Sequence, residues 1–197
     1  DNYGFAEPNN IAVKTAMGKY LLFLNNDTVV NSNFVEELLN AMNQDPQVAI
    51  SQSMLLKPNG DIDSSGDFID TLGRAYSSKI RPTSIQYILS ARGASMMVRK
   101  DIFLRLGGFD KSFFASYEDV DIGWRAWLWG YKVVLAPSSI VYHTGGQTIK
   151  QLDSLIMFHA VKNSMILFLT NFESFFAFKS LIIFSFIIMM RKMFGLM

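Results

Sequence analysis

The chain contains 197 residues, 50% of them apolar and 18% charged, which is enough for one domain with a full core and too apolar for disorder. Its net charge of +1, with no Lys/Arg cluster, argues against nucleic acid as a partner. The chain has no cysteine, which excludes disulfides, thiolate zinc sites and cysteine nucleophiles.

The first part of the chain alternates between helix and strand patterns. A short helix is expected to end at Gly18, and a second one, capped by Asn31 or Ser32, carries its apolar residues on one face. The apolar runs at 20–24 and 48–56 have the composition of buried parallel strands. This alternation predicts an α/β fold with a mostly parallel sheet flanked by helices.

The second part continues the alternation after a polar, Gly/Ser-rich stretch at 61–93 that has no clear pattern. The expected elements are a strand at 94–98, helices at 100–106 and 119–129, and a strand at 132–136 followed by Val141, Tyr142 and His143. Between the two helices, Phe113 and Phe114 are expected to lie exposed on a loop that faces a substrate. A fall in charge near residue 150 predicts a boundary between a domain at 1–150 and a helical tail at 151–197.

The tail is expected to contact a membrane through residues 175–190, which are almost wholly apolar and precede Arg191 and Lys192. A membrane span needs about 20 apolar residues, and this run of 16 contains Lys179. An interfacial or re-entrant helix, a marginal span, and a helix packed on another part of the protein all remain open. We expect a cytoplasmic location at the inner face of the cell membrane.

Asp27 lies two or three residues beyond the apolar run at 20–24. Ligands of open α/β sheets bind beyond the carboxyl ends of the strands, and Mg²⁺ is often shared between a carboxylate and substrate phosphates. Asp27 is therefore a candidate metal ligand. The alternative is that Asn25, Asn26 and Asp27 only form a turn.

Three carboxylates, Glu118, Asp119 and Asp121, lie at the expected start of a helix. A base at this position would face a cleft, but Ser116 and Asp119 also match a capping box, and acidic residues favour a helix N-terminus. Asp121 is spaced for a surface ion pair with Arg125, and we assign it a structural role. The catalytic and capping interpretations of Glu118 and Asp119 both remain open.

His143 is one of two histidines, and it follows an expected strand. A single histidine at a strand end is more often structural than a ligand. It is nevertheless placed to complete a metal site with Asp27. His159 lies among apolar residues of an expected helix, and we assign it no role.

An ordered series of motifs resembles the family 2 glycosyltransferases, which have the GT-A fold, and in particular their rhamnosyl- and galactofuranosyltransferase-like branch. The series covers roughly residues 1–150. It consists of NYGFAEPNN, the A-x-G that ends at Gly18, FLNNDT, RGASMMVRK, LGGFDKSFF, YEDVDIGWR and GYKVVLAPSSIVYH. Each motif is weak alone, but their order is highly specific.

The resemblance implies a metal-dependent, inverting transfer of a sugar from a nucleotide-sugar donor to a glycan or lipid-linked acceptor. Asp119 would be the catalytic base, and Glu118 would support it or position the acceptor. A divalent cation, Mg²⁺ or Mn²⁺, would be bound by Asp27 and by His143. The donor would also contact the side chains or backbone of the residues Asn10, Asn25 and Gly93.

The resemblance has two departures. Asn25 replaces the first aspartate of the family's metal motif, and QTIKQ at 147–151 does not match the motif of processive synthases, which favours single transfers. The family also begins with a strand and a nucleotide-binding loop that precede the first motif here, so the chain is expected to be an N-terminally shortened piece. A non-catalytic module that binds nucleotide sugars or glycans on the same fold is the alternative, and a membrane-anchoring protein is a third interpretation.

Overall fold

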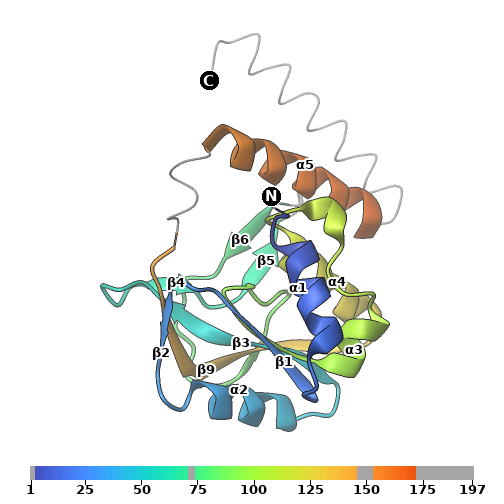
Figure 1. The fold of residues 1–197 in the computed structure, drawn as a ribbon. Helices are drawn as coiled ribbons and strands as arrows, with labels where there is room; N and C mark the ends of the chain where they lie inside the picture. The colour runs from blue at the N-terminus through green and yellow to red at the C-terminus, as the bar shows by residue number, and fades with distance from the viewer. Residues whose placement is uncertain (1–2, 71–73, 146–152, 172–197) are drawn as a thin grey trace.

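A central β-sheet covered by helices on both faces forms the body of the protein (Figure 1). The computed structural model describes residues 3–70, 74–145 and 153–171. The helices are α1 (Ala6–Thr15), α2 (Phe34–Asn43), α3 (Lys100–Arg105), the 3₁₀ turn η1 (Lys111–Phe113), α4 (Glu118–Leu128) and α5 (Asp153–Asn171). The strands are β1 (Tyr20–Leu24), β2 (Thr28–Val30), β3 (Val48–Leu56), β4 (Ile62–Ser64), β5 (Asp67–Ile69), β6 (Ala75–Ser77), β7 (Gln86–Tyr87), β8 (Ser95–Arg99) and β9 (Lys132–His143).

The sheet is mixed in direction. Its strands follow the order β1-β8-β3-β9-β2, with β4 paired to β3 and β7 to β9, while β5 and β6 form a separate hairpin. Within the described residues only β3 and β9 pair in parallel, and β8 runs antiparallel to both β1 and β3. The α/β fold class is confirmed, with one correction: the sheet is not mostly parallel.

The strands look parallel in sequence because the sheet is buried on both faces. Along β9, Val133 and Leu135 join the cluster under α1, α3 and α4, whereas Val134 and Ala136 join the cluster under α2. All nine residues of β3 are buried. A strand covered on both sides gives a continuous apolar run whatever its direction, so the run alone does not distinguish parallel from antiparallel pairing.

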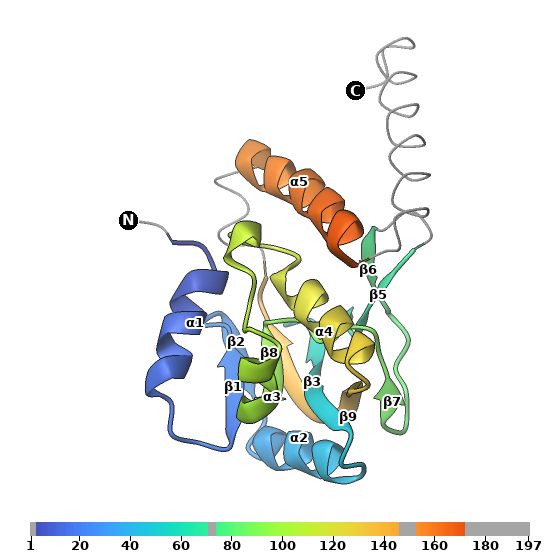
Figure 2. The same ribbon diagram turned by 90° about the vertical axis from the view of Figure 1, so that its right-hand side faces the viewer.

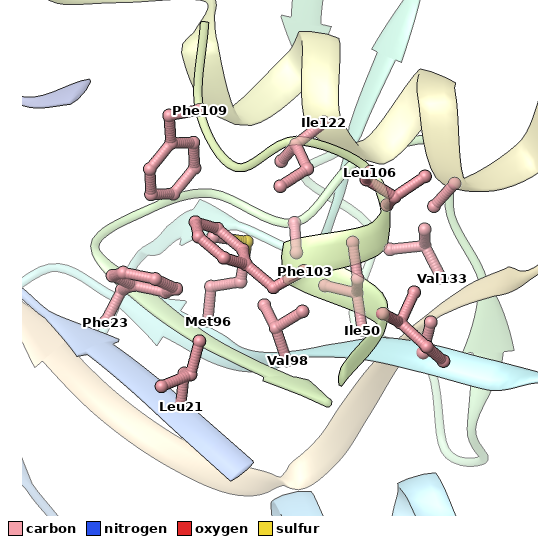
Figure 3. Close-up of a cluster of buried hydrophobic side chains, with 14 of the residues drawn as sticks. Leu21, Phe23, Ile50, Met96, Val98, Phe103, Leu106, Phe109, Ile122 and Val133 are labelled. Carbon is pink, nitrogen blue, oxygen red and sulfur yellow. The ribbon is translucent and has the colours of Figure 1, made fainter. Parts of the chain in front are cut away.

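An aromatic cluster fixes the end of β1 (Figure 3). The ring of Phe23 lies 5.3 Å from that of Phe103 and 4.9 Å from that of Phe109, measured between centroids, and the last two rings are 5.1 Å apart. Phe103 and Phe109 are almost fully buried. Because Phe23 lies two residues before Asn25, this packing fixes the position of the polar residues that follow β1.

Helix α5 lies across the segment between η1 and α4 (Figure 2). Its Leu167 is fully buried against Phe113 and Val120. The expected membrane contact at 175–190 lies outside the described residues. Among the helices that the structure describes, none has the length and apolar character needed to cross a membrane.

Candidate active site

Residues from four distant segments converge on one pocket of about 480 Å³. Asn25 follows β1, Gly93 precedes β8, Glu118 and Asp119 begin α4, and His143 ends β9. These are five of the residues expected to form the site. Because β1 and β9 both end here while α4 begins here, the pocket combines strand carboxyl ends with a helix N-terminus.

Asp119 is held firmly by two backbone amides. The N–H of Gly93 donates to Oδ2 at 2.9 Å, and the N–H of Val120 donates to Oδ1 at 2.8 Å. Burial raises the pKa of Asp119, and the charge of Asp67 raises it further, against the opposing effect of these hydrogen bonds and of Arg92. A carboxylate with a raised pKa is a better proton acceptor, so this geometry suits a general base.

Glu118 also lines the pocket but is only 5% exposed. Its Oε2 is buried and has no hydrogen-bond partner among the residues that the structure describes. Burial raises the pKa of Glu118 well above its usual range, and the neighbouring charge of Asp119 adds to this effect. An unpartnered buried carboxyl oxygen is costly, which is typical of an atom that awaits a ligand.

The helix that carries these carboxylates does not begin with a capping box. Its N-cap is Tyr117, which has no side-chain capping bond, and Ser116 takes no capping role. The capping interpretation of Ser116 and Asp119 is therefore wrong. Asp121 is structural as expected: its Oδ2 lies 2.5 Å from Nη2 of Arg125, although the carboxylate is buried and not on the surface.

His143 lies between two carboxylates. Its Nε2 is 3.3 Å from Oδ1 of Asp27, and its Nδ1 is 2.9 Å from Oδ2 of Asp63. The hydrogen bond to Asp63 raises the pKa of His143, and the same bond lowers the pKa of Asp63. The expected pairing of Asp27 with His143 is present, whereas Asp63 was not foreseen, because it lies in the stretch without a readable pattern.

This arrangement fits a divalent cation. Mg²⁺ binds its ligands at about 2.0–2.1 Å, so two adjacent ligand atoms lie about 3 Å apart, close to the separation of Asp27 Oδ1 and His143 Nε2. Asp63 accepts a hydrogen from Nδ1 when that nitrogen is protonated, which leaves Nε2 free to bind a metal. No group of three or more acidic or histidine side chains surrounds one point within the described residues, and Asp27 and His143 are the two of them that would bind the ion.

Arg92 is a site residue that the sequence did not reveal. Its guanidinium lies 3.4 Å from Asp63 and 3.3 Å from Asp67. Burial alone would lower the pKa of Arg92, but the charges of Asp67 and Asp63 outweigh it and raise the pKa. Arg92 and His143 also line a neighbouring pocket of about 510 Å³, so they join the two cavities.

Three other expected site residues lie differently from the prediction. Phe113 is fully buried, so the expectation of an exposed ring is wrong, because the chain turns it beneath α5. Phe114 is half-buried and stacks on His159 at 5.0 Å. The Asn10 amide exchanges two hydrogen bonds with the backbone of Phe109 and lines a separate pocket, so we assign it to holding α1 in place.

Comparisons with known proteins agree on the family. Residues 20–192 match the family described as glycosyl transferase family group 2. The O-antigen biosynthesis protein RfbC of Myxococcus xanthus is 32% identical over 155 residues, which is 72% of this chain and 12% of that protein. An N-acetylglucosaminyl-diphospho-decaprenol L-rhamnosyltransferase of Mycobacterium tuberculosis is 41% identical over 51 residues, which is 26% of this chain and 17% of that enzyme.

Solved structures show the same fold at low sequence identity. GalNAc-T7 with UDP, GalNAc and Mn²⁺ has a TM-score of 0.60 at 17% identity, over 72% of this chain and 30% of that one. S. aureus TarS 1–349 in complex with UDP has a TM-score of 0.58 at 15% identity, over 92% of this chain and 50% of that one. The expected GT-A fold is confirmed. The chain belongs to glycosyl transferase family group 2, within which it is similar to rhamnosyltransferases.

Proposed function

We propose that the protein transfers a sugar from a nucleotide-sugar donor to a hydroxyl of a glycan or lipid-linked acceptor, with inversion and in single transfers. One observation carries the proposal: Asp119 lies in the same pocket as His143, which pairs with Asp27. The candidate base and one member of the candidate metal-binding pair thus line one cavity. The named relatives, an O-antigen biosynthesis protein and an N-acetylglucosaminyl-diphospho-decaprenol L-rhamnosyltransferase, support this class of donor and acceptor.

Asp119 would act as the base. As the acceptor oxygen forms its bond to the anomeric carbon, its proton passes to the Asp119 carboxylate, and the bond from that carbon to the diphosphate oxygen breaks. Attack from the face opposite the leaving group inverts the configuration. The amides of Gly93 and Val120 keep the carboxylate oriented, and the buried carboxyl of Glu118 would bind a substrate hydroxyl.

Asp27 and His143 would hold the divalent cation, Mg²⁺ or Mn²⁺. The bound ion would neutralise charge on the departing nucleotide diphosphate. Asp63 orients the His143 ring from its other nitrogen, and Asn25 adds a neutral donor contact. The Mn²⁺ named in the GalNAc-T7 structure supports the use of a divalent cation. A cytoplasmic position at the inner face of the membrane would bring a lipid-linked acceptor within reach.

The test is the Asp119→Asn variant of the full-length protein, assayed with a panel of nucleotide sugars and Mn²⁺. We expect transfer to fall by about 10²-fold or more, the usual scale for loss of a general base, while donor binding persists. If the variant turns over substrate at the wild-type rate, Asp119 is not the catalytic base. Titration calorimetry with UDP and Mn²⁺ tests the alternative of a non-catalytic binding module. If the wild-type protein binds UDP but transfers no sugar from any donor, the binding module is favoured.

A further inference from the structure

The segment between η1 and α4 has an unusual backbone. Three of its non-glycine residues have positive φ: Phe114 at 60°, Ser116 at 70° and Tyr117 at 75°. At Phe114, ψ is −67° and the N–H of Ala115 bonds to the carbonyl of Phe113 at 2.7 Å, which is the rare γ-turn of positive φ. Such conformations persist only where surrounding groups hold them, and they concentrate at functional sites.

Five consecutive carbonyls, from Ser112 in η1 to Ser116, accept hydrogen bonds from other parts of the chain. Lys162 Nζ donates to Ser112, and Phe5 N–H donates to Phe114 at 2.7 Å. A single side chain holds the other three. Asn163 Nδ2 of α5 lies 2.7 Å from the carbonyl oxygen of Phe113, 2.9 Å from that of Ala115 and 2.7 Å from that of Ser116.

All hydrogen bonds of the Asn163 side chain among the described residues go to this backbone. The side chain is fully buried, and its two N–H groups serve three acceptors, so one hydrogen is shared. Its Oδ1 is buried and has no hydrogen-bond partner within the described residues. Ordinary packing of α5 does not need a polar group here, since the neighbouring contact is apolar: Leu167 meets Phe113 and Val120. The amide therefore serves the backbone conformation.

This backbone leads directly to the base. Tyr117 is the N-cap of α4 in the left-handed conformation, and Glu118 and Asp119 follow it. If the carbonyls of Ala115 and Ser116 were released, the first turn of α4 would shift. Asp119 would then lose its bond to the amide of Gly93, which lies on a different segment.

We propose that Asn163 is a positioning residue for the catalytic base, so that α5 completes the active site from beyond residue 150. The inference rests on the proposed function of Asp119. It differs from it in what is tested: Asn163 is not among the residues that line the pocket, and it acts through the backbone of residues 113–117, of which Ala115, Ser116 and Tyr117 do line it.

The experiment compares Asn163→Leu with Ser164→Ala in the full-length protein. Leucine branches at the same carbon as asparagine but donates no hydrogen bond. Ser164 is the matched control, because it is also buried and its hydroxyl donates to the carbonyl of Val161 in the same helix, its one side-chain bond among the described residues. Asn163→Ala is a second variant in case leucine prevents folding. Thermal unfolding establishes the folded fraction of each protein.

We expect Asn163→Leu to lower kcat by about 10²-fold, the scale for a base displaced by about 1 Å, with the donor KM changed less than threefold. In the Asp119→Asn background the same change should have almost no further effect, because the two residues act as one unit. Hydrogen exchange at the Gly93 and Val120 amides, which bind Asp119, should become at least tenfold faster. Ser164→Ala should match the wild type in each measurement.

Wild-type exchange rates at Gly93 and Val120 in a folded Asn163 variant would overturn the inference, and so would a kcat equal to that of the control. The proposed function fails separately. If the wild type transfers no sugar from any donor, the exchange rates still decide whether Asn163 holds Asp119 in place.

Discussion

Two aspartates of α4, one turn apart at most, are expected to respond in opposite ways to the same substitution. Asp119→Asn should lower transfer by about 10²-fold or more and leave stability nearly unchanged. Asp121→Asn should weaken the fold and leave the chemistry of each folded molecule intact. The contrast follows from their partners: Asp119 binds backbone amides inside a pocket, whereas Asp121 binds the guanidinium of Arg125.

The magnitudes follow from burial and hydrogen bonding. The side chains of Asp121 and Arg125 are 5% and 21% exposed. Breaking a fully buried ion pair costs about 3–5 kcal/mol and an exposed helical pair about 0.5 kcal/mol, so about 2 kcal/mol is expected here, because Arg125 keeps the carbonyls of Leu106 and Gly108. At Asp119, one lost hydrogen bond of about 1 kcal/mol is offset by removal of a buried carboxyl whose pKa is raised.

Calorimetry at pH 7.5 measures both variants against the wild type. For a chain of this size, 2 kcal/mol lowers Tm by about 4–8 °C, so Asp121→Asn should show that fall and Asp119→Asn a change of at most about 3 °C. Transfer is then compared per folded molecule. The reasoning is refuted if Asp121→Asn keeps its Tm but loses transfer, or if Asp119→Asn is the less stable of the two.

Three further outcomes are expected. Leu38→Ala, at a fully buried position under the sheet, should cost about 3 kcal/mol and lower Tm by roughly 10 °C in a thermal scan. Glu118→Gln should raise Tm at pH 7.5 but not at pH 4. Because the pKa of Glu118 is raised in the folded state, the stability of the wild type falls as the pH rises above the unfolded-state pKa of about 4.3, and glutamine removes this loss. A Tm difference that stays constant from pH 4 to 7.5 would contradict this reasoning. Gly4→Ala should reduce both stability, measured by calorimetry, and sugar transfer. The reason is that Gly4 has φ +72° and an added Cβ would lie 2.2 Å from the carbonyl oxygen of Phe114.

Much of the site follows from local sequence patterns. Asp27 was located because an apolar strand ends just before it, and Glu118 and Asp119 because three acids precede an amphipathic helix. Both patterns depend on a few neighbouring residues, so no knowledge of distant contacts is needed. The ordered motifs then predicted that these segments share a pocket, and Asn25, Gly93 and His143 do line it with the α4 carboxylates.

The rest depends on tertiary contacts that leave no local signal. β2, β4, β5 and β6 have three residues each, too short for a periodic pattern. Asp63 and Arg92 gain their roles only by meeting His143 and Asp67 across the fold. Asn163 stands between Lys162 and Ser164 in α5, and the role proposed for it depends on the carbonyls of a segment about 50 residues earlier.

The placement of β3 has a consequence for synthesis of the protein. This strand is buried at all nine positions, yet its sheet neighbours β8 and β9 begin only at Ser95 and Lys132. At translation rates of about 5–20 residues per second, β3 waits on the order of 10 s for its parallel partner. Until β8 is made, neither long edge of β3 is paired, and the edge that pairs with β9 stays open for the whole interval, so we expect the nascent chain to depend on holdase chaperones and to fold slowly once released.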